Sequence, residues 1–209
     1  MSKVLCWEKK TELVFSPKGK DDMQPVETLS DDAIQILCDA LIARTLIEKL
    51  SVIKIEIRKE GAVAFAKLLK FCTTLEDLSL NDNKLGDNGA SCIAKGLHEN
   101  VSLKTLNLQN NLIDNNGVSR LAEALESNAM LNTFGLIGNQ IREDGAKALV
   151  QMLEANCNIE NLEVKQNKIN AKGLKKLDSA RKHSNSLKVH ICFGFEMQLE
   201  FFIGVSQPG

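Results

Sequence analysis

The feature that most constrains the fold of this chain is a motif that recurs every 28 residues. Its most regular copy, residues 103–117, reads LKTLNLQNNLIDNNG. In-phase copies begin at Leu75, Leu131 and Ile159, and each keeps three apolar residues, an asparagine, a further aliphatic residue and a glycine. Self-similarity at a fixed period of about 20–50 residues indicates a solenoid, in which each repeat packs against its neighbours.

Each repeat is predicted to contain a short strand, a bend and a helix. Leu78 and Leu80 are two residues apart, so their side chains point to the same side of a strand, into the core. Apolar residues then recur at helical spacing, as at Ala90, Ile93, Ala94 and Leu97. The predicted fold is therefore α/β: a short curved stack of strand–helix repeats with parallel strands on the concave face.

Recurrent polar and small residues are given structural roles. An asparagine ends each strand, where its amide satisfies turn backbone groups, and four of them predict a ladder: Asn83, Asn111, Asn139 and Asn167. A glycine in the first turn of each helix is expected to permit close approach of helix and strand. At the helix ends, Asn100, Asn128 and Asn156 are expected to adopt the left-handed C-terminal conformation.

The two ends of the chain depart from the repeat, which divides it into residues 1–29, 30–186 and 187–209. The first segment is predicted to be an N-terminal cap, with a hairpin over residues 3–15 and a loop after it. The array begins with a helix at about 31–43 whose strand half is missing or degenerate, and the next repeat has Ile55 where later ones have asparagine.

The last segment alternates apolar and polar residues from Leu187 to Ile203, which indicates an edge strand or hairpin. It either caps the core of the last repeat or offers an apolar edge to a partner. His190 falls where the repeat places a core leucine, so it is either a buried histidine or a sign that the last strand has shifted.

Composition narrows the environment and the partners. The net charge is −1, from 26 basic and 27 acidic residues without a basic stripe, so nucleic acid and anionic membranes are not expected partners. No apolar run approaches the roughly 20 residues that span a bilayer, and no secretory signal is seen. The six cysteines form no C-x-x-C pair, so we expect reduced thiols in a cytoplasmic protein.

The sequence contains no recognisable set of catalytic residues. The three histidines are scattered, and no G-x-S-x-G, H-E-x-x-H, Walker A or dinucleotide-binding motif is present. We therefore expect no enzymatic activity, no cofactor and no metal.

The repeats resemble the ribonuclease-inhibitor-like subfamily of leucine-rich repeats. The resemblance rests on residues 102–128, SLKTLNLQNNLIDNNGVSRLAEALESN, and covers roughly residues 30–192. Similar repeats occur in NOD-like receptors, in Ran GTPase-activating protein and in axonemal proteins. The resemblance implies the fold, while function does not transfer within the family because one scaffold serves many partners.

The predicted binding surface comprises the outward side chains of the strands and the C-terminal strand. It contains Lys49, Asp77, Asn81, Asn107, Gln109, Glu163, Lys165, Val189, Ile191, Phe193 and Phe201. The favoured hypothesis is a non-catalytic protein-interaction or scaffold module, within a multi-protein cytoskeletal or ciliary assembly. The alternatives are a regulator that activates a small GTPase and a truncated relative of the NOD-like receptor arrays.

Overall fold

The computed structural model of this 209-residue chain describes residues 12–16, 29–43, 47–182 and 188–190. Strands and helices alternate along these ranges. The strands are β1 Glu12–Phe15, β2 Lys49–Val52, β3 Asp77–Ser79, β4 Thr105–Asn107, β5 Thr133–Gly135, β6 Asn161–Glu163 and β7 Lys188–His190. The helices are α1 Asp31–Ala43, α2 Lys59–Phe71, α3 Gly86–His98, α4 Asn115–Glu126, α5 Glu143–Ala155 and α6 Ala171–Lys182.

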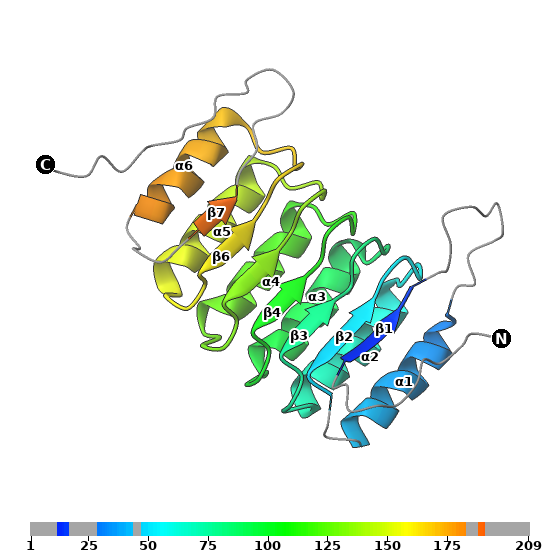
Figure 1. Cartoon of the computed structure of the whole chain (residues 1–209). Helices are drawn as coiled ribbons and strands as arrows, with labels where there is room; N and C mark the ends of the chain where they lie inside the picture. Colours follow the sequence, from blue (N-terminus) through cyan, green and yellow to red (C-terminus); the bar gives the residue numbers. More distant parts are fainter. Residues whose placement is uncertain (1–11, 17–28, 44–46, 183–187, 191–209) are drawn as a thin grey trace, which may run out of the picture.

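All seven strands form one parallel sheet in the order of the sequence (Figure 1). Parallel neighbours need a crossover connection, and each crossover here contains one helix. The helices line one side of the sheet, with α1 and α6 at opposite ends of the stack (Figure 1). From β2 to β6 the strands pair in steps of 28 residues, as Lys49 with Asp77 and Asp77 with Thr105. The predicted α/β solenoid of strand–helix repeats is confirmed.

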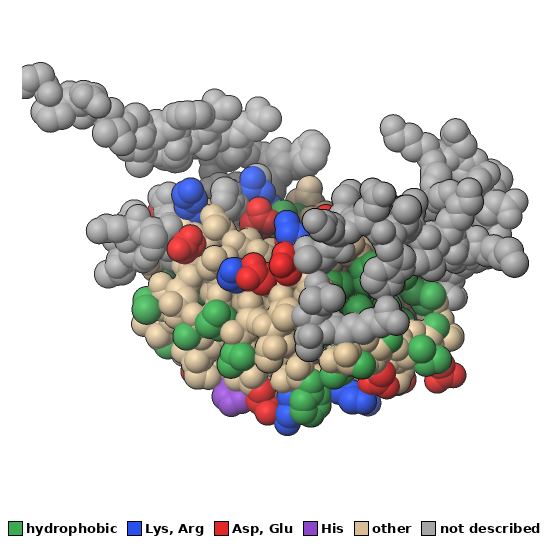
Figure 2. Space-filling model, turned by 60° about the horizontal axis from the view of Figure 1, so that its bottom comes forward, with side chains coloured by type: hydrophobic (Ala, Val, Ile, Leu, Met, Phe, Trp, Pro, Cys, Tyr) green, Lys and Arg blue, Asp and Glu red, His purple; other side chains and the backbone are tan. Residues whose placement is uncertain are grey.

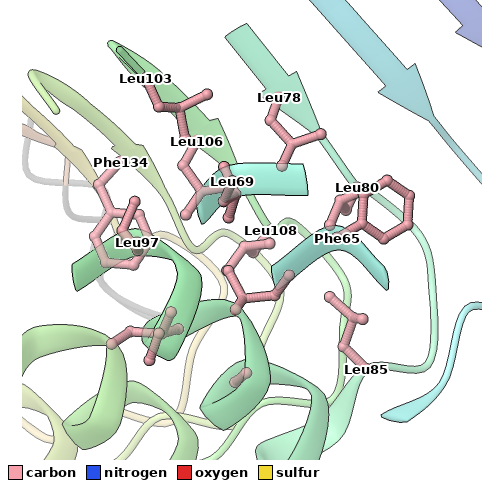
Figure 3. Packing of buried hydrophobic residues seen from close by; sticks show 14 of the residues in the cluster. Phe65, Leu69, Leu78, Leu80, Leu85, Leu97, Leu103, Leu106, Leu108 and Phe134 are labelled. Atoms are coloured by element: carbon pink, nitrogen blue, oxygen red, sulfur yellow. The ribbon is translucent and has the colours of Figure 1, made fainter. Parts of the chain in front are cut away.

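The core lies between the sheet and the helices. The central residue of each strand from β3 to β6 is buried, as Leu78, Leu106 and Phe134 are. Figure 3 shows these side chains together with helical residues such as Phe65 and Leu97, which are also fully buried. Because each repeat shares its apolar layer with the next, the core is continuous along the stack.

The strand-end asparagines form a row of hydrogen bonds between repeats. Each donates its Nδ2 group to a carbonyl oxygen 31 residues earlier, at 2.8–3.0 Å: Asn83 to Val52, Asn111 to Leu80, Asn139 to Leu108 and Asn167 to Leu136. The Oδ1 atom of Asn139 accepts from the backbone N–H groups of Asn111 and Ile113 at 3.0 Å. These bonds satisfy backbone groups at the bends, which the strand ladder does not reach.

The helix-end asparagines form a second row, and the expected left-handed conformation is wrong. None of Asn100, Asn128 and Asn156 has a positive φ, and Asn156 is extended with φ −108° and ψ 116°. Their side chains instead cap the preceding helix: Asn128 Nδ2 donates to Leu97 O at 2.9 Å, and its Oδ1 atom accepts from Leu131 N. Side-chain capping removes the need for a left-handed residue.

The helix-opening glycines are buried because two neighbours press against them. A Cβ atom on Gly145 would lie 2.7 Å from both Ile141 Cγ2, at the bend of the same repeat, and Val118 Cγ1, on the preceding helix. The close approach is therefore to the bend and to the neighbouring helix, where the sequence predicted close approach to the strand.

At the amino end, the strand expected to be missing or degenerate before the first helix is present, and it overlaps the second apolar run of the predicted hairpin. β1 pairs with β2 in parallel, Glu12 with Lys49, a separation of 37 residues instead of 28. The additional residues fall between Phe15 and Asp31, which hides the strand from a search at fixed period. Of the predicted hairpin, residues 3–11 lie outside the described residues, as does most of the loop after it.

At the carboxyl end, the spacing shortens by one residue. Leu162 pairs with Val189 and Glu163 with His190, so the step from β6 to β7 is 27 residues. The last strand has shifted, which decides between the two interpretations of His190. Val189 was expected on the concave face, and this placement is wrong: it packs against the core. The predicted strand beyond 190 lies outside the described residues.

Candidate protein-binding surface

The strand register builds rows of outward side chains across the concave face. The residues before the buried central positions form a first row: Lys49, Asp77, Thr105, Thr133 and Asn161. Those after them form a second row: Ser51, Ser79, Asn107, Gly135 and Glu163. Alternation along a strand places both rows opposite the core, on one continuous surface.

A third row follows the strands, because backbone pairing continues past their ends. Leu108 N donates to Gly135 O at 2.8 Å, and Asn110 N donates to Ile137 O at 2.9 Å. The third row contains Ile53, Asn81, Gln109, Ile137 and Lys165, all partly exposed. Asn81 Oδ1 accepts a hydrogen bond from Gln109 N at 3.0 Å, which fixes this amide side chain on the surface.

The charges of the concave face lie towards its two ends. Glu12, Lys49 and Asp77 stand side by side on β1, β2 and β3. Partial burial raises the pKa of Asp77, Lys49 opposes this shift, and Glu12 adds to it. Glu163, Lys165 and Lys188 lie towards the other end. The centre, formed by residues such as Thr105, Asn107 and Gln109, is polar and uncharged.

The centre of this face also contains a glycine, which carries no side chain. At Gly135 a Cβ atom would lie only 2.7 Å from Asn107 Oδ1, so a larger residue here would displace its neighbour in the second row. The molecular surface seen in Figure 2 has acidic and basic side chains intermixed, without a field of one sign. This face therefore offers hydrogen-bonding groups at its centre and charged groups towards its two ends.

Seven of the predicted binding residues share this face, and four do not. Lys49, Asp77, Asn81, Asn107, Gln109, Glu163 and Lys165 lie in the three rows. Val189 points to the core, and Ile191, Phe193 and Phe201 lie outside the described residues. The sequence search missed Glu12, Val14 and Lys188, which belong to strands displaced from the 28-residue period. The apolar run at Leu13–Phe15 was the signal available for β1.

The described part of the chain offers no group of three or more potential ligand side chains that could hold a metal ion. Burial raises the pKa of the Cys38 thiol to about 12, so this cysteine is not a nucleophile near neutral pH. His98 lies at a helix end, with its Nδ1 atom 3.4 Å from Ser127 Oγ. None of the described helices combines the length and the apolar character needed to cross a membrane.

Comparison with known proteins identifies the repeat. Residues 71–94, 99–122 and 155–177 match the family model described as leucine-rich repeat. The chain carries leucine-rich repeats. A search of curated proteins gives no match.

Solved structures share the fold at low sequence identity. Leiomodin-1 actin-binding site 2 aligns with a TM-score of 0.59 and 19% identity, over 74% of this chain and 88% of that one. The tropomodulin C-terminal domain of Caenorhabditis elegans aligns with a TM-score of 0.55 and 12% identity, over 74% of this chain and 92% of that one. At these identities the similarity establishes the leucine-rich repeat fold.

Proposed function

We propose that this protein is a non-catalytic protein-binding module whose concave strand face receives a partner protein. The observation that carries the proposal is the set of in-register polar rows on neighbouring strands. They form a broad surface on a rigid scaffold, and the hydrogen-bonding groups at its centre are held by their neighbours. Such a surface suits a folded partner, since it offers many shallow contacts.

The proposed partner class is cytoskeletal. Two structures with this fold come from leiomodin-1 actin-binding site 2 and from tropomodulin, and this supports actin as the first partner to test. A cytoplasmic location in a multi-protein cytoskeletal or ciliary assembly belongs to the same proposal. So does membership of the ribonuclease-inhibitor-like subfamily, which the 28-residue pairing of β2 to β6 supports.

Substitutions at the centre of the concave face test the proposal. Thr105→Arg/Gln109→Arg adds two large cations where the surface is polar and uncharged, and neither side chain caps a backbone group. Co-sedimentation with purified filamentous actin should show affinity reduced about tenfold or more. The matched control Asn88→Arg/Gln151→Arg adds the same charge on exposed helical positions and should bind like wild type.

Two results would contradict this proposal. Absence of binding by the wild-type protein to filamentous and monomeric actin would remove actin as the partner. Equal loss of binding in the control variant would remove the concave face as the site.

The alternative function is regulation of a small GTPase, which the resemblance to Ran GTPase-activating protein implies. This function needs no catalytic motif in the repeats, because the GTPase supplies its own machinery. Stimulation of GTP hydrolysis by about tenfold or more with a purified small GTPase would favour it over the cytoskeletal proposal. Thr105→Arg/Gln109→Arg should abolish that stimulation if the same face is used.

A further inference from the structure

A second surface lies on the helical side of the stack, between α5 and α6. A groove of about 760 Å³ opens there, lined by Val150 and Glu154 of α5 and by Ala171, Lys175, Lys176 and Ala180 of α6. Its floor is apolar and its rim carries lysines. This groove is separate from the concave face, because the helices and the outward rows of the sheet lie on opposite sides of the core.

The groove lies where a small residue of α6, Ala180, is left partly exposed. Between α2 and α3, Gly96 packs directly against the backbone of Ala66, since a Cβ atom would lie 2.5 Å from Ala66 O. At the equivalent position of α5, Met152 is fully buried. In α6 this position is Ala180, which is shorter than Met152 and only partly buried.

Charge is concentrated on α6. This helix contains five basic residues and one acidic residue, although the net charge of the chain is −1. The sequence search found no basic stripe because these charges are balanced by acidic residues elsewhere in the chain. The structure gathers three lysines of one helix at the edge of one groove.

Two of the groove lysines are available to a ligand. Lys172 is engaged by Glu143 at 3.0 Å, at one end of the groove. Lys175 and Lys176 form no ion pair with another residue in the described part of the chain, and both are at least partly exposed. Placing a carboxylate near them would therefore add ion pairs without breaking one.

We propose that the α5–α6 groove binds a short acidic segment of a partner protein, with small apolar side chains on the floor and carboxylates beside Lys175 and Lys176. The combination of an apolar floor and a basic rim favours a peptide, since a peptide supplies both kinds of group in one segment. Glu154 on the rim disfavours a uniform polyanion such as nucleic acid or an anionic lipid surface.

A fluorescence polarisation titration tests this site with the full-length protein. The probe is a labelled helical peptide of about 15 residues that contains only Ala, Leu and Glu. In a control peptide of the same length, every Glu is replaced by Gln. Lys175→Glu/Lys176→Glu should weaken binding of the Glu peptide about tenfold or more, and added salt should weaken it in wild type. Lys59→Glu/Lys95→Glu, exposed on α2 and α3, changes the net charge equally and should bind within about twofold of wild type.

A second variant separates the groove from general charge attraction. Ala180→Phe fills the floor without changing charge, so it should also weaken binding about tenfold, with folding checked by circular dichroism. Failure of wild type to prefer the Glu peptide, equal weakening in the α2/α3 control, or unchanged binding by Ala180→Phe would each overturn the proposal.

Other ligands of the groove would give different experimental results. Tighter binding of single-stranded RNA or of phosphatidylserine vesicles than of the Glu peptide would overturn the peptide proposal in favour of that ligand. Self-association that Lys175→Glu/Lys176→Glu abolishes would identify a second copy of the chain as the occupant. Each result is independent of the actin test, because Thr105→Arg/Gln109→Arg leaves the groove intact.

Discussion

Asn83 supplies hydrogen bonds to the bend around Ile55, in the preceding repeat. Its Oδ1 atom accepts from the backbone N–H groups of Ile55 and Ile57 at 3.0 and 3.2 Å. Ile55 stands where later repeats carry asparagine, so its side chain cannot form such hydrogen bonds with the strand that precedes it in the sheet. It is buried instead, with 5% of its surface exposed. The asparagine ladder therefore starts at the second of the 28-residue repeats and reaches back to the first.

This arrangement predicts that the middle of the ladder is sensitive to substitution. Asn139→Ala should lower the free energy of unfolding by about 3 kcal/mol or more, because several buried backbone groups lose their partners. Those groups include Leu108 O, Leu136 O and Ile113 N. Urea denaturation measures the change. Asn116→Ala, at an exposed position, should stay within about 0.5 kcal/mol of wild type, and a similar loss there would contradict the argument.

The packing of α3 against α2 predicts that an alanine at position 96 lowers stability, whereas helix propensity predicts that it raises stability. Alanine is favoured over glycine inside a helix by about 1 kcal/mol, yet Gly96→Ala should destabilise the protein. The new Cβ atom would lie 2.5 Å from Ala66 O and 2.8 Å from Ala66 Cα, which are backbone atoms and cannot move alone. The expected loss is about 1–3 kcal/mol in urea denaturation. Lys95→Ala, on the exposed side of the same helix, should be close to neutral, and a stabilised Gly96→Ala variant would refute the close contact.

Much of the fold was predictable because the sequence repeats it. The leucines of residues 103–108 set the strand, the following asparagine sets the bend, and the period sets the register of β2 to β6. Where the period fails, the predicted register fails as well, although strands were expected in both segments: β1 is displaced by extra residues before Asp31, and β7 by one missing residue. Both errors concern spacing, and the apolar residues that form each strand, such as Leu13 and Val189, are present in the sequence.

Backbone conformation at the bends was less predictable. A left-handed residue recurs at one position, and its φ lies between 54° and 69° at Lys54, Asp82, Asn110, Gly138 and Gln166. Glycine, and to a lesser degree asparagine and aspartate, adopt this conformation readily. Lys54 and Gln166 adopt it because inter-repeat pairing fixes the bend, as Lys54 N shows by donating to Asn81 O. Tertiary structure therefore overrides local preference, and no single copy of the repeat reveals it.

The same reasoning explains why the two proposed binding surfaces were only partly predicted. The period locates the three outward rows, since strand alternation is local. The α5–α6 groove depends on the partial exposure of Ala180 and on which lysines share one side of a helix. Those are relations between neighbouring helices, so they require the packed structure.

The charged end of the concave face predicts a pH dependence. Burial raises the pKa of Asp77 above its ordinary value of 3.8, so the folded state binds the proton more tightly than the unfolded state does. The folded state therefore loses stability as pH rises through the interval between 3.8 and the raised pKa. Asp77→Asn should raise Tm at pH 7 by about 1 °C or more, and the difference should vanish near pH 3.

Lys49 provides the control for this effect, because its charge opposes the shift of Asp77. Lys49→Gln should lower Tm at pH 7, and Asp77→Asn should be more stabilising in that background than in wild type. Differential scanning calorimetry measures both. An Asp77→Asn variant that is less stable than wild type at pH 7 would show that attraction to Lys49 outweighs the cost of burial.

The shortened last repeat gives a test of strand register. Val189 pairs with Leu162 and packs against the core, whereas Lys188 precedes it and faces outward. Val189→Asp should therefore lower the free energy of unfolding by about 2 kcal/mol, since it places a carboxylate against apolar side chains. Lys188→Asp should change it by about 0.5 kcal/mol or less. Under an unbroken 28-residue period, residue 189 faces solvent and the neighbouring residues face the core. A tolerated Val189→Asp would restore that register and return Val189 to the concave face, so urea denaturation of the two variants decides which residues of β7 belong to that face.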